Sequence, residues 1–177
     1  RLSQIHSKRV IQVPEHFIEG MNGDGMYTDN KTSTLIVTVA DCLPIFLWDN
    51  NVKCFGIVHS GWRGTGIVLN AIDGLLRITG SSTSDIHVLI GPGIGPCCYD
   101  ISEERASLFP KSCSHKRFGR TYLDLRRVNL ELLEAYGVAE LTIMDSCTSC
   151  DSRLHSYRRE GPENFQRMYA AIGKFRN

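Results

Sequence analysis

The sequence lacks both a long apolar segment and an excess of charge of either sign. It has 177 residues, with 20 Lys and Arg against 19 Asp and Glu, and neither sign forms a long run. The absence of a basic patch argues against a nucleic-acid partner. No apolar stretch approaches the roughly 20 residues that span a bilayer, and no basic segment followed by an apolar one opens the chain. We therefore expect no membrane partner and a cytoplasmic location.

The chain also lacks an even set of cysteines. It has seven, so a closed disulfide framework cannot use them all, and an apolar share of 42% provides a core that does not need one. The pair Cys147 and Cys150 has a spacing found in zinc sites and in redox pairs alike. Structural zinc requires two more ligands, and the adjacent Cys97 and Cys98 are an awkward second pair because neighbouring side chains diverge in most backbone conformations. Ordinary reduced thiols are the favoured interpretation.

The length and the apolar pattern predict one α/β domain over residues 1–177. Short runs rich in β-branched and aromatic residues precede and follow segments of helical spacing. Strands are predicted at residues 34–39, 43–48, 54–59, 85–91 and 139–145, the last of them buried. Helices are predicted from Thr65 to Thr79, from Ser102 to Leu108, from Asp124 to Gly137, and from about Glu163 to Ala171. The early strands can pair directly, which favours mixed β-sheet layers covered by helices over a regular parallel winding.

Reactive side chains stand at the ends of the most apolar runs. Asp41 and Cys42 interrupt one run, His59 closes the next, and His6 lies in the segment QIHSKRV. Two imidazoles and one thiolate are zinc ligands, and three protein ligands leave a fourth position for water or substrate. Their spacing matches no local zinc motif, so ordinary packing is one alternative. Another is a Cys42 nucleophile activated by His59, with backbone amides of SGWRG stabilising the developing anion.

Charged residues near these positions are candidates for substrate contacts. Arg63, on a glycine-flanked turn next to His59, is the first candidate to bind a substrate anion, and Arg158 in SYRREG can grip a phosphate or carboxylate or form a solvated salt bridge. Asp41 can act as an acid-base group or support its neighbour Cys42 through a hydrogen bond. The glycines of GPGIGP, residues 91–96, match no nucleotide-binding fingerprint and indicate close backbone approach.

Seven motifs occur in the order typical of one family. They are QIHS, TVADCLPI, VHSGWRGT, GPGIGPCCYDI, YLDLRRVN, DSCTSCD and HSYRREG. On these motifs the chain resembles the YfiH/laccase-domain family, also called multicopper polyphenol oxidases or DUF152 proteins. The resemblance implies a YfiH-like domain that binds zinc through His6, Cys42 and His59. Typical members carry a further N-terminal β region, so the N-terminal part of the family domain is expected to be missing here. Ser7 replaces a glycine common in the family, and EGPENFQRM replaces DGxTGRM around Arg167.

The resemblance also implies purine nucleoside chemistry. The reactions are phosphorolysis of adenosine, inosine, guanosine or methylthioadenosine and deamination of adenosine, with inorganic phosphate as co-substrate and a monomer or homodimer as the protein. Zinc bound by the triad can activate water for attack on adenine, with Cys42 and Asp41 as catalytic residues, while Arg63 holds phosphate beneath the ribose. The usual zinc deaminase signature is absent, so deamination requires a different acid-base residue.

Three rival functions use the same residues. Copper-dependent phenol oxidation makes copper the alternative metal, but full laccase chemistry needs more imidazole ligands than six scattered histidines provide. A cysteine hydrolase or amidase acting on cell-wall precursors would use Cys42 as its nucleophile. A scaffold in which zinc only holds the fold together is disfavoured by the open coordination position.

Overall fold

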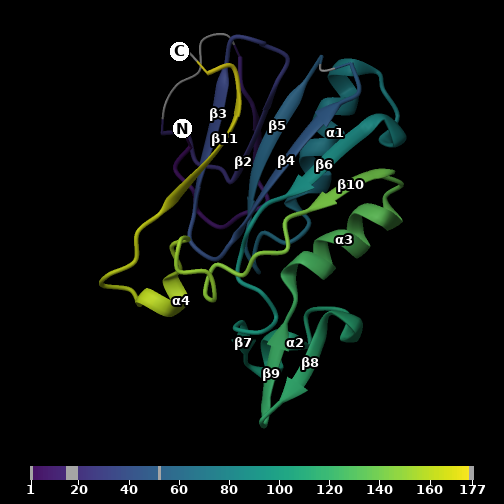
Figure 1. Ribbon diagram of the computed structural model, residues 1–177. Helices are drawn as coiled ribbons and strands as arrows, with labels where there is room; N and C mark the ends of the chain where they lie inside the picture. The colour runs from purple at the N-terminus through teal and green to yellow at the C-terminus, as the bar shows by residue number, and fades with distance from the viewer. Residues whose placement is uncertain (1, 15–19, 52, 176–177) are drawn as a thin grey trace.

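A mixed β-sheet organises the molecule. A computed structural model of the protein describes residues 2–14, 20–51 and 53–175. In that part of the chain, a six-stranded sheet has the order β1-β2-β5-β4-β6-β10 (Figure 1). Its strands are β1 (Val10–Gln12), β2 (Gly25–Thr28), β4 (Leu43–Asp49), β5 (Phe55–Ser60), β6 (Ile86–Ile90) and β10 (Glu140–Ile143). The two outer pairs are parallel and the inner pairs antiparallel, which confirms the predicted mixed sheet.

Further strands and helices cover this sheet on both faces. On one face, β3 and β11 form an antiparallel pair whose apolar residues cluster with those of β5, and on the other face α1 and α3 enclose a second core (Figure 1). A small sheet of β7, β9 and β8 lies at the foot of the molecule as drawn in Figure 1. These elements are β3 (Thr34–Val39), β7 (Asp100–Ile101), β8 (Ser114–Arg117), β9 (Arg120–Leu123), β11 (Met168–Gly173), α1 (Ile67–Thr79), α2 (Glu103–Ala106), α3 (Leu125–Ala135) and α4 (Tyr157–Glu160).

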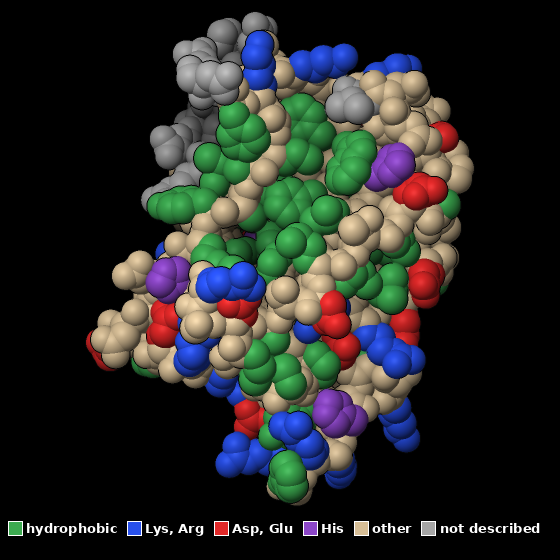
Figure 2. Space-filling view, in the orientation of Figure 1, with side chains coloured by type: hydrophobic (Ala, Val, Ile, Leu, Met, Phe, Trp, Pro, Cys, Tyr) green, Lys and Arg blue, Asp and Glu red, His purple; other side chains and the backbone are tan. Residues whose placement is uncertain are grey.

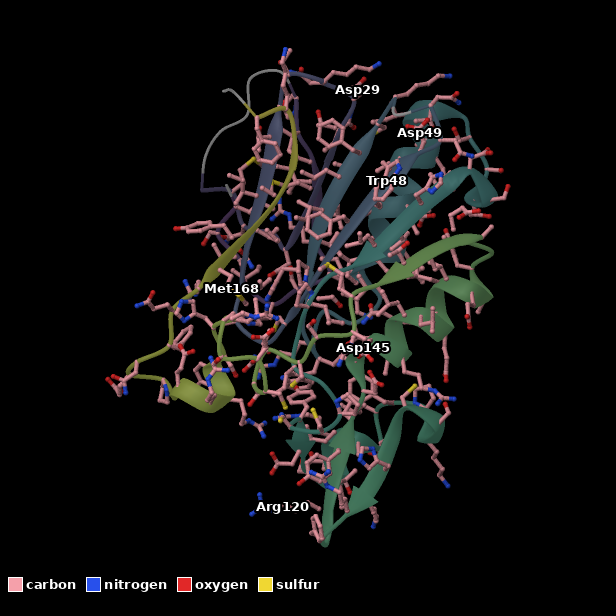
Figure 3. All side chains as sticks on the ribbon, in the orientation of Figure 1. Asp29, Trp48, Asp49, Arg120, Asp145 and Met168 are labelled. Carbon is pink, nitrogen blue, oxygen red and sulfur yellow. The ribbon has the colours of Figure 1, made fainter. Side chains whose placement is uncertain are left out.

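The central strands are buried on both faces, which explains why their apolar runs do not alternate with polar residues. On β4, Leu43, Ile45 and Leu47 face the core beneath the helices. Phe46 and Trp48 of the same strand pack against the core under β3 and β11 (Figure 3). The two cores together hold the ends of these strands in fixed positions.

The helix α1 forms where the apolar spacing changes to that of a helix. Val68, Ile72 and Leu75 are buried along one side, and Gly80 ends the helix in a left-handed conformation, with its N–H donating to the carbonyl of Leu76. Among the described residues, no helix is long and apolar enough to cross a bilayer.

Two sequence predictions about the C-terminal part are wrong. The segment from Glu163 to Ala171 is not a helix, because Met168, Ala170 and Ile172 alternate toward a core and β11 pairs with β3. The strand predicted as buried, β10, lies at a sheet edge and is largely exposed. Figure 2 shows apolar side chains gathered on the face of the molecule that it draws. Ile143 of β10 and Tyr169 of β11 are among the exposed large hydrophobic residues.

The contact between α1 and β2 predicts a core substitution that should not be tolerated. A Cβ added at Gly74 would overlap the ring carbons Cε1 and Cζ of the buried Tyr27. Alanine gains about 1 kcal/mol of helix propensity over glycine, whereas overpacking costs roughly 1–3 kcal/mol. We therefore expect Gly74→Ala to lower the free energy of unfolding, measured by urea denaturation.

The matched control is Arg77→Ala, an exposed position in the same helix. It should change the free energy of unfolding by no more than about 0.5 kcal/mol. A Gly74→Ala protein as stable as its parent would mean that the Tyr27 ring has room to turn aside.

Candidate metal centre and active-site cavity

The structure brings together the three residues that the sequence analysis selects as metal ligands. His6 lies in the loop before β1, Cys42 in the turn between β3 and β4, and His59 near the end of β5. One ligand atom from each lies within 4.8 Å of the other two. The two imidazole rings meet edge to face, with centroids 4.9 Å apart. Residues 36 and 17 positions apart in the chain thus share one small volume.

The convergence depends on Asp24, which precedes β2 and which sequence reasoning missed. Its carboxylate accepts hydrogen bonds from the backbone N–H groups of His6 at 2.9 Å and Ser7 at 2.6 Å, and from the Ser7 hydroxyl at 2.8 Å. The same carboxylate lies 3.0 Å from Nδ1 of His59. Asp24 therefore holds the loop of His6 against the strand of His59. The one signal in the sequence is a lone aspartate between two glycines directly before a strand.

The fully buried Asp24 also sets the charge state of the centre. Burial would raise the pKa of Asp24, but hydrogen bonds from His59 and Ser7 hold it well below its ordinary value. Burial would lower the pKa of His59, yet Asp24 and Cys42 raise it to about 9. Burial would raise the pKa of the Cys42 thiol, yet His59 and His6 lower it to about 7. With a pKa of about 7, roughly half of Cys42 is in the thiolate form near neutral pH, and the thiolate is the form that binds metals and attacks electrophiles.

Cys42 is placed by a strained turn. Asp41 has a left-handed backbone with φ of 81°, and both of its carboxylate oxygens are used: one accepts from the Thr148 hydroxyl at 2.6 Å and the other from the backbone N–H of Arg158 at 2.7 Å. Gly61 makes room for the sulfur, since a Cβ there would lie 2.7 Å from Cys42 Sγ. Asp41 therefore positions Cys42, and each of its carboxylate oxygens accepts one hydrogen bond.

The three residues line a cavity of about 820 Å³. Aromatic side chains form much of its wall, and Tyr157 and Phe165 meet edge to face at 5.0 Å. The lining residues include His6, Asp41, Cys42, His59, Trp62, Tyr99, Arg105, Tyr157, Arg158, Phe165 and Arg167. Burial and the neighbouring Cys42 raise the pKa of Tyr99, so its phenol stays protonated at neutral pH. The volume suits a ligand of the size of a nucleoside.

The arginines differ in how they meet this cavity. Arg63 is exposed, packs against the Trp62 ring at 4.9 Å and is not part of the wall. Arg105 lies 4.4 Å from the same ring, lines the cavity and forms no ion pair with a carboxylate in the described part of the chain. Arg158 lines the cavity too, but its guanidinium binds Asp100 and the carbonyl of Cys98. Arg167 also lines the cavity, but it is exposed and lies over the Phe165 ring at 5.7 Å. The half-buried Arg105 is therefore the cation best placed to meet a bound anion.

The donor set fits a zinc ion. Two imidazoles and one thiolate are ligands that zinc accepts. Three protein ligands at the wall of a cavity leave a fourth coordination position for a reactant. The bond from His59 Nδ1 to Asp24 fixes the ring orientation and leaves Nε2 available, an arrangement typical of metal-bound histidines. The blue-copper arrangement also requires an axial ligand such as Met or Gln. No methionine is among the described residues that line the cavity, and the amide of the lining Gln4 is hydrogen-bonded to the backbone of Thr38.

The position of Asp24 predicts a large effect of Asp24→Asn on stability. Removing one partner of a buried charged pair costs roughly 3–5 kcal/mol, so the metal-free variant should lose about 3 kcal/mol of its free energy of unfolding near pH 6. Asp29→Asn, an exposed change at the other end of β2, is the matched control and should stay within about 0.5 kcal/mol (Figure 3).

The pH dependence of this effect follows from the two pKa shifts. The folded-state pKa of Asp24 is lowered, so its stabilisation is present above the ordinary value of about 3.9 and is lost as the pH falls further. The pKa of His59 is raised to about 9, so its stabilisation is complete below about pH 6.5 and is lost as the pH rises through about 9. Urea denaturation should show the widest gap between parent and Asp24→Asn from about pH 4 to 6.5. A gap independent of pH would contradict the paired charges.

The chain is similar to a known family and to several named proteins. A family model described as multi-copper polyphenol oxidoreductase laccase matches residues 1–174. A protein named purine nucleoside phosphorylase from Borreliella burgdorferi is 32% identical over 89% of this chain and 72% of its own length. Purine nucleoside phosphorylase YlmD from Geobacillus stearothermophilus is 36% identical over 85% of this chain, which spans 60% of that relative.

Solved structures share the fold. The hypothetical protein YfiH from Bacillus licheniformis matches 97% of this chain and 72% of its own with a TM-score of 0.88 at 29% identity. YlmD from Geobacillus stearothermophilus matches 97% of this chain and 71% of its own with a TM-score of 0.86 at 31% identity. Since the family model covers nearly all of the sequence and these structures share its architecture, the chain belongs to the YfiH family of multi-copper polyphenol oxidoreductase laccases.

Proposed function

We propose that the protein is a zinc-dependent purine nucleoside phosphorylase that also deaminates adenosine. The observation that carries this proposal is the open set of two imidazoles and one cysteine sulfur in the wall of a cavity. The same wall offers aromatic rings and Arg105, which has no carboxylate ion-pair partner among the described residues. Relatives named purine nucleoside phosphorylase support the same reaction class. Zinc, when bound by His6, Cys42 and His59, supplies Lewis-acid charge next to the substrate.

The aromatic residues hold the purine base in this proposal. Trp62, Tyr99, Tyr157 and Phe165 all line the cavity. Stacking of a base on such a ring contributes about 1–3 kcal/mol in other proteins and tolerates different bases. A wall of this kind fits a site that accepts adenosine, inosine, guanosine and methylthioadenosine.

Arg105 holds the phosphate. In phosphorolysis a phosphate oxygen bonds to C1′ of the ribose, the C1′–N bond to the purine breaks, and its electron pair stays on the purine nitrogen. A guanidinium positions the dianion and offsets its charge as it approaches C1′. Arg63, the choice from sequence, lies outside the cavity wall, so Arg105 takes this role in our proposal.

Tyr99 and Asp41 have different parts in the reaction. The Tyr99 phenol, protonated at neutral pH, can donate a hydrogen bond to the departing purine. Asp41 acts by holding the turn of Cys42, because both of its oxygens already accept hydrogen bonds. Deamination replaces the amino group at C6 by oxygen from water and releases ammonia.

A cysteine hydrolase is the second candidate. It is favoured by the position of Cys42, whose sulfur lies within 4.8 Å of ring nitrogens of His6 and His59, two groups that lower its pKa. Copper oxidation has less support, since the described histidines outside the centre, His87, His115 and His155, lie on β6, on β8 and just before α4.

The reaction class can be tested directly. Zinc-loaded protein should release purine base from a nucleoside panel only when inorganic phosphate is present, with ribose 1-phosphate as the other product. Chromatography of both products measures this. Cleavage of an amide substrate with no nucleoside turnover would instead favour the hydrolase.

The phosphate site is tested by comparing two arginines. Loss of a charge-assisted hydrogen bond costs about 1.5–3 kcal/mol, so Arg105→Ala should raise KM for phosphate by roughly 10-fold to 100-fold. Arg63→Ala removes the other guanidinium beside Trp62 and should leave that KM within about 2-fold, since its cost at a surface position stays near 0.5 kcal/mol. The reverse pattern in steady-state kinetics would assign the phosphate to Arg63.

A further inference from the structure

A second cluster of sulfur ligands lies outside the site described above. Cys97 and Cys98 follow β6, and Cys147 and Cys150 follow β10. One ligand atom from each of the four lies within 4.8 Å of all the others. Sγ of Cys150 is 3.6 Å from Sγ of Cys97 and 3.4 Å from that of Cys98. In Figure 3, yellow sulfur atoms gather between the six-stranded sheet and the small sheet.

The adjacent cysteines converge because they lie in a tight turn. The backbone N–H groups of Cys98 and Tyr99 both donate to the carbonyl of Gly95, at 3.0 Å. In such a helix-like turn, neighbouring side chains point about 100° apart, whereas in an extended strand they point to opposite sides. Both thiols can therefore reach Cys150. The divergence expected for adjacent cysteine side chains is therefore absent in this turn.

The second pair is held in register with the first. Gly93 pairs with Cys147 in an isolated bridge, and the Thr148 N–H donates to the Gly93 carbonyl at 3.1 Å. The Gly95 N–H donates to Cys147 Sγ at 3.1 Å. Such a bond stabilises a thiolate. The two loops thus present their sulfurs to one point through backbone contacts that do not depend on an ion.

We propose that Cys97, Cys98, Cys147 and Cys150 bind one zinc ion in a four-thiolate structural site. A tetrahedral site with Zn–S bonds of about 2.3 Å has sulfur atoms about 3.8 Å apart, close to the two separations observed. Four protein ligands leave no position for a reactant, so the ion has a structural role. Such a site carries a net charge of about −2, and three guanidinium groups lie around it. They donate to the carbonyls of Cys97, Cys98 and Thr148 from Arg117, Arg158 and Arg159.

This ion braces the turn that carries Cys42. Thr148, fully buried between the two cysteines of its loop, donates its hydroxyl to Asp41, the residue before Cys42. From the other loop, the Ile94 N–H donates to the Asp41 carbonyl at 2.8 Å. Both loops that hold Asp41 are therefore joined by the four sulfurs. The site fixes the ends of β6 and β10 against the centre without contacting a substrate.

Zinc content of the full chain, purified with reductant and measured by mass spectrometry of the metal, tests the proposal. Cys150→Ser should contain about one equivalent less zinc than its parent, and Cys42→Ala should keep about one equivalent, because the two sites are separate. Cys113→Ala is the matched control. Cys113 is a buried cysteine of the core enclosed by α1 and α3, and its loss should leave the zinc content unchanged. Zinc content equal in Cys150→Ser and its parent would overturn the site.

The two proposals fail separately in this experiment. If the centre of His6, Cys42 and His59 holds no zinc, the parent contains about one equivalent and Cys150→Ser none, which still supports the four-cysteine site.

A second measurement holds even if Cys150→Ser does not fold. Cys42→Ala protein loaded with Co²⁺ should show strong thiolate-to-cobalt absorption, which requires several sulfur ligands. No such band, or a disulfide between two of the four cysteines in the reduced preparation, would overturn the proposal.

Discussion

The Asp24 carboxylate accepts hydrogen bonds from the loop of His6 and from the ring of His59, two parts of the chain that the sequence separates widely. A buried carboxylate is costly unless its lone pairs are used, and here backbone N–H groups, a hydroxyl and an imidazole use them. The same bonds that offset the cost of burying Asp24 set the spacing of His6 and His59, two candidate metal ligands. The Asp24 carboxylate therefore sets both the spacing of the two histidines and the protonation of His59.

The β-sheet brings the reactive groups to one end of the molecule. His59 is near the end of β5, Cys42 comes directly before β4, and Asp24 directly before β2. β5 lies between β2 and β4 and is antiparallel to both, so these three positions meet at one end of the sheet. The loops that follow β6 and β10 leave the sheet at that same end. Hydrophobic packing on both faces of the sheet holds this end of the strands in place. The loops that carry the cysteines extend from the same end. The positions of the candidate site residues at the ends of the strands thus depend on the packing of the two buried cores.

The sequence predicts the elements whose pattern is local. The runs at residues 34–39 and 43–48 form strands. Their β-branched and aromatic side chains favour a buried strand whichever strands pair with it, so the sequence alone identifies them. The segment up to Ala171 could not be assigned in the same way, since its pairing partner β3 lies far away in the sequence. The exposure of β10 likewise depends on which neighbour covers it.

The candidate site shows the same division between local and distant information. Family motifs point to His6, Cys42 and His59, and the structure brings these residues together. Nothing about a single aspartate shows that it will meet His59, because that contact exists only once β2 pairs with β5. The spacing of Cys97 and Cys98 likewise does not predict the turn that brings both thiols close to Cys150.

The left-handed backbone of His6 and Asp41 has a consequence for how this protein can change. At φ of 57° and 81°, a residue with a side chain pays about 1 kcal/mol or more that glycine would not. Selection for thermal resistance alone would therefore favour glycine at both positions. Glycine at these positions would remove the strain together with one candidate metal ligand and the carboxylate that holds the turn of Cys42, so the proposed activity and the strain depend on the same two side chains.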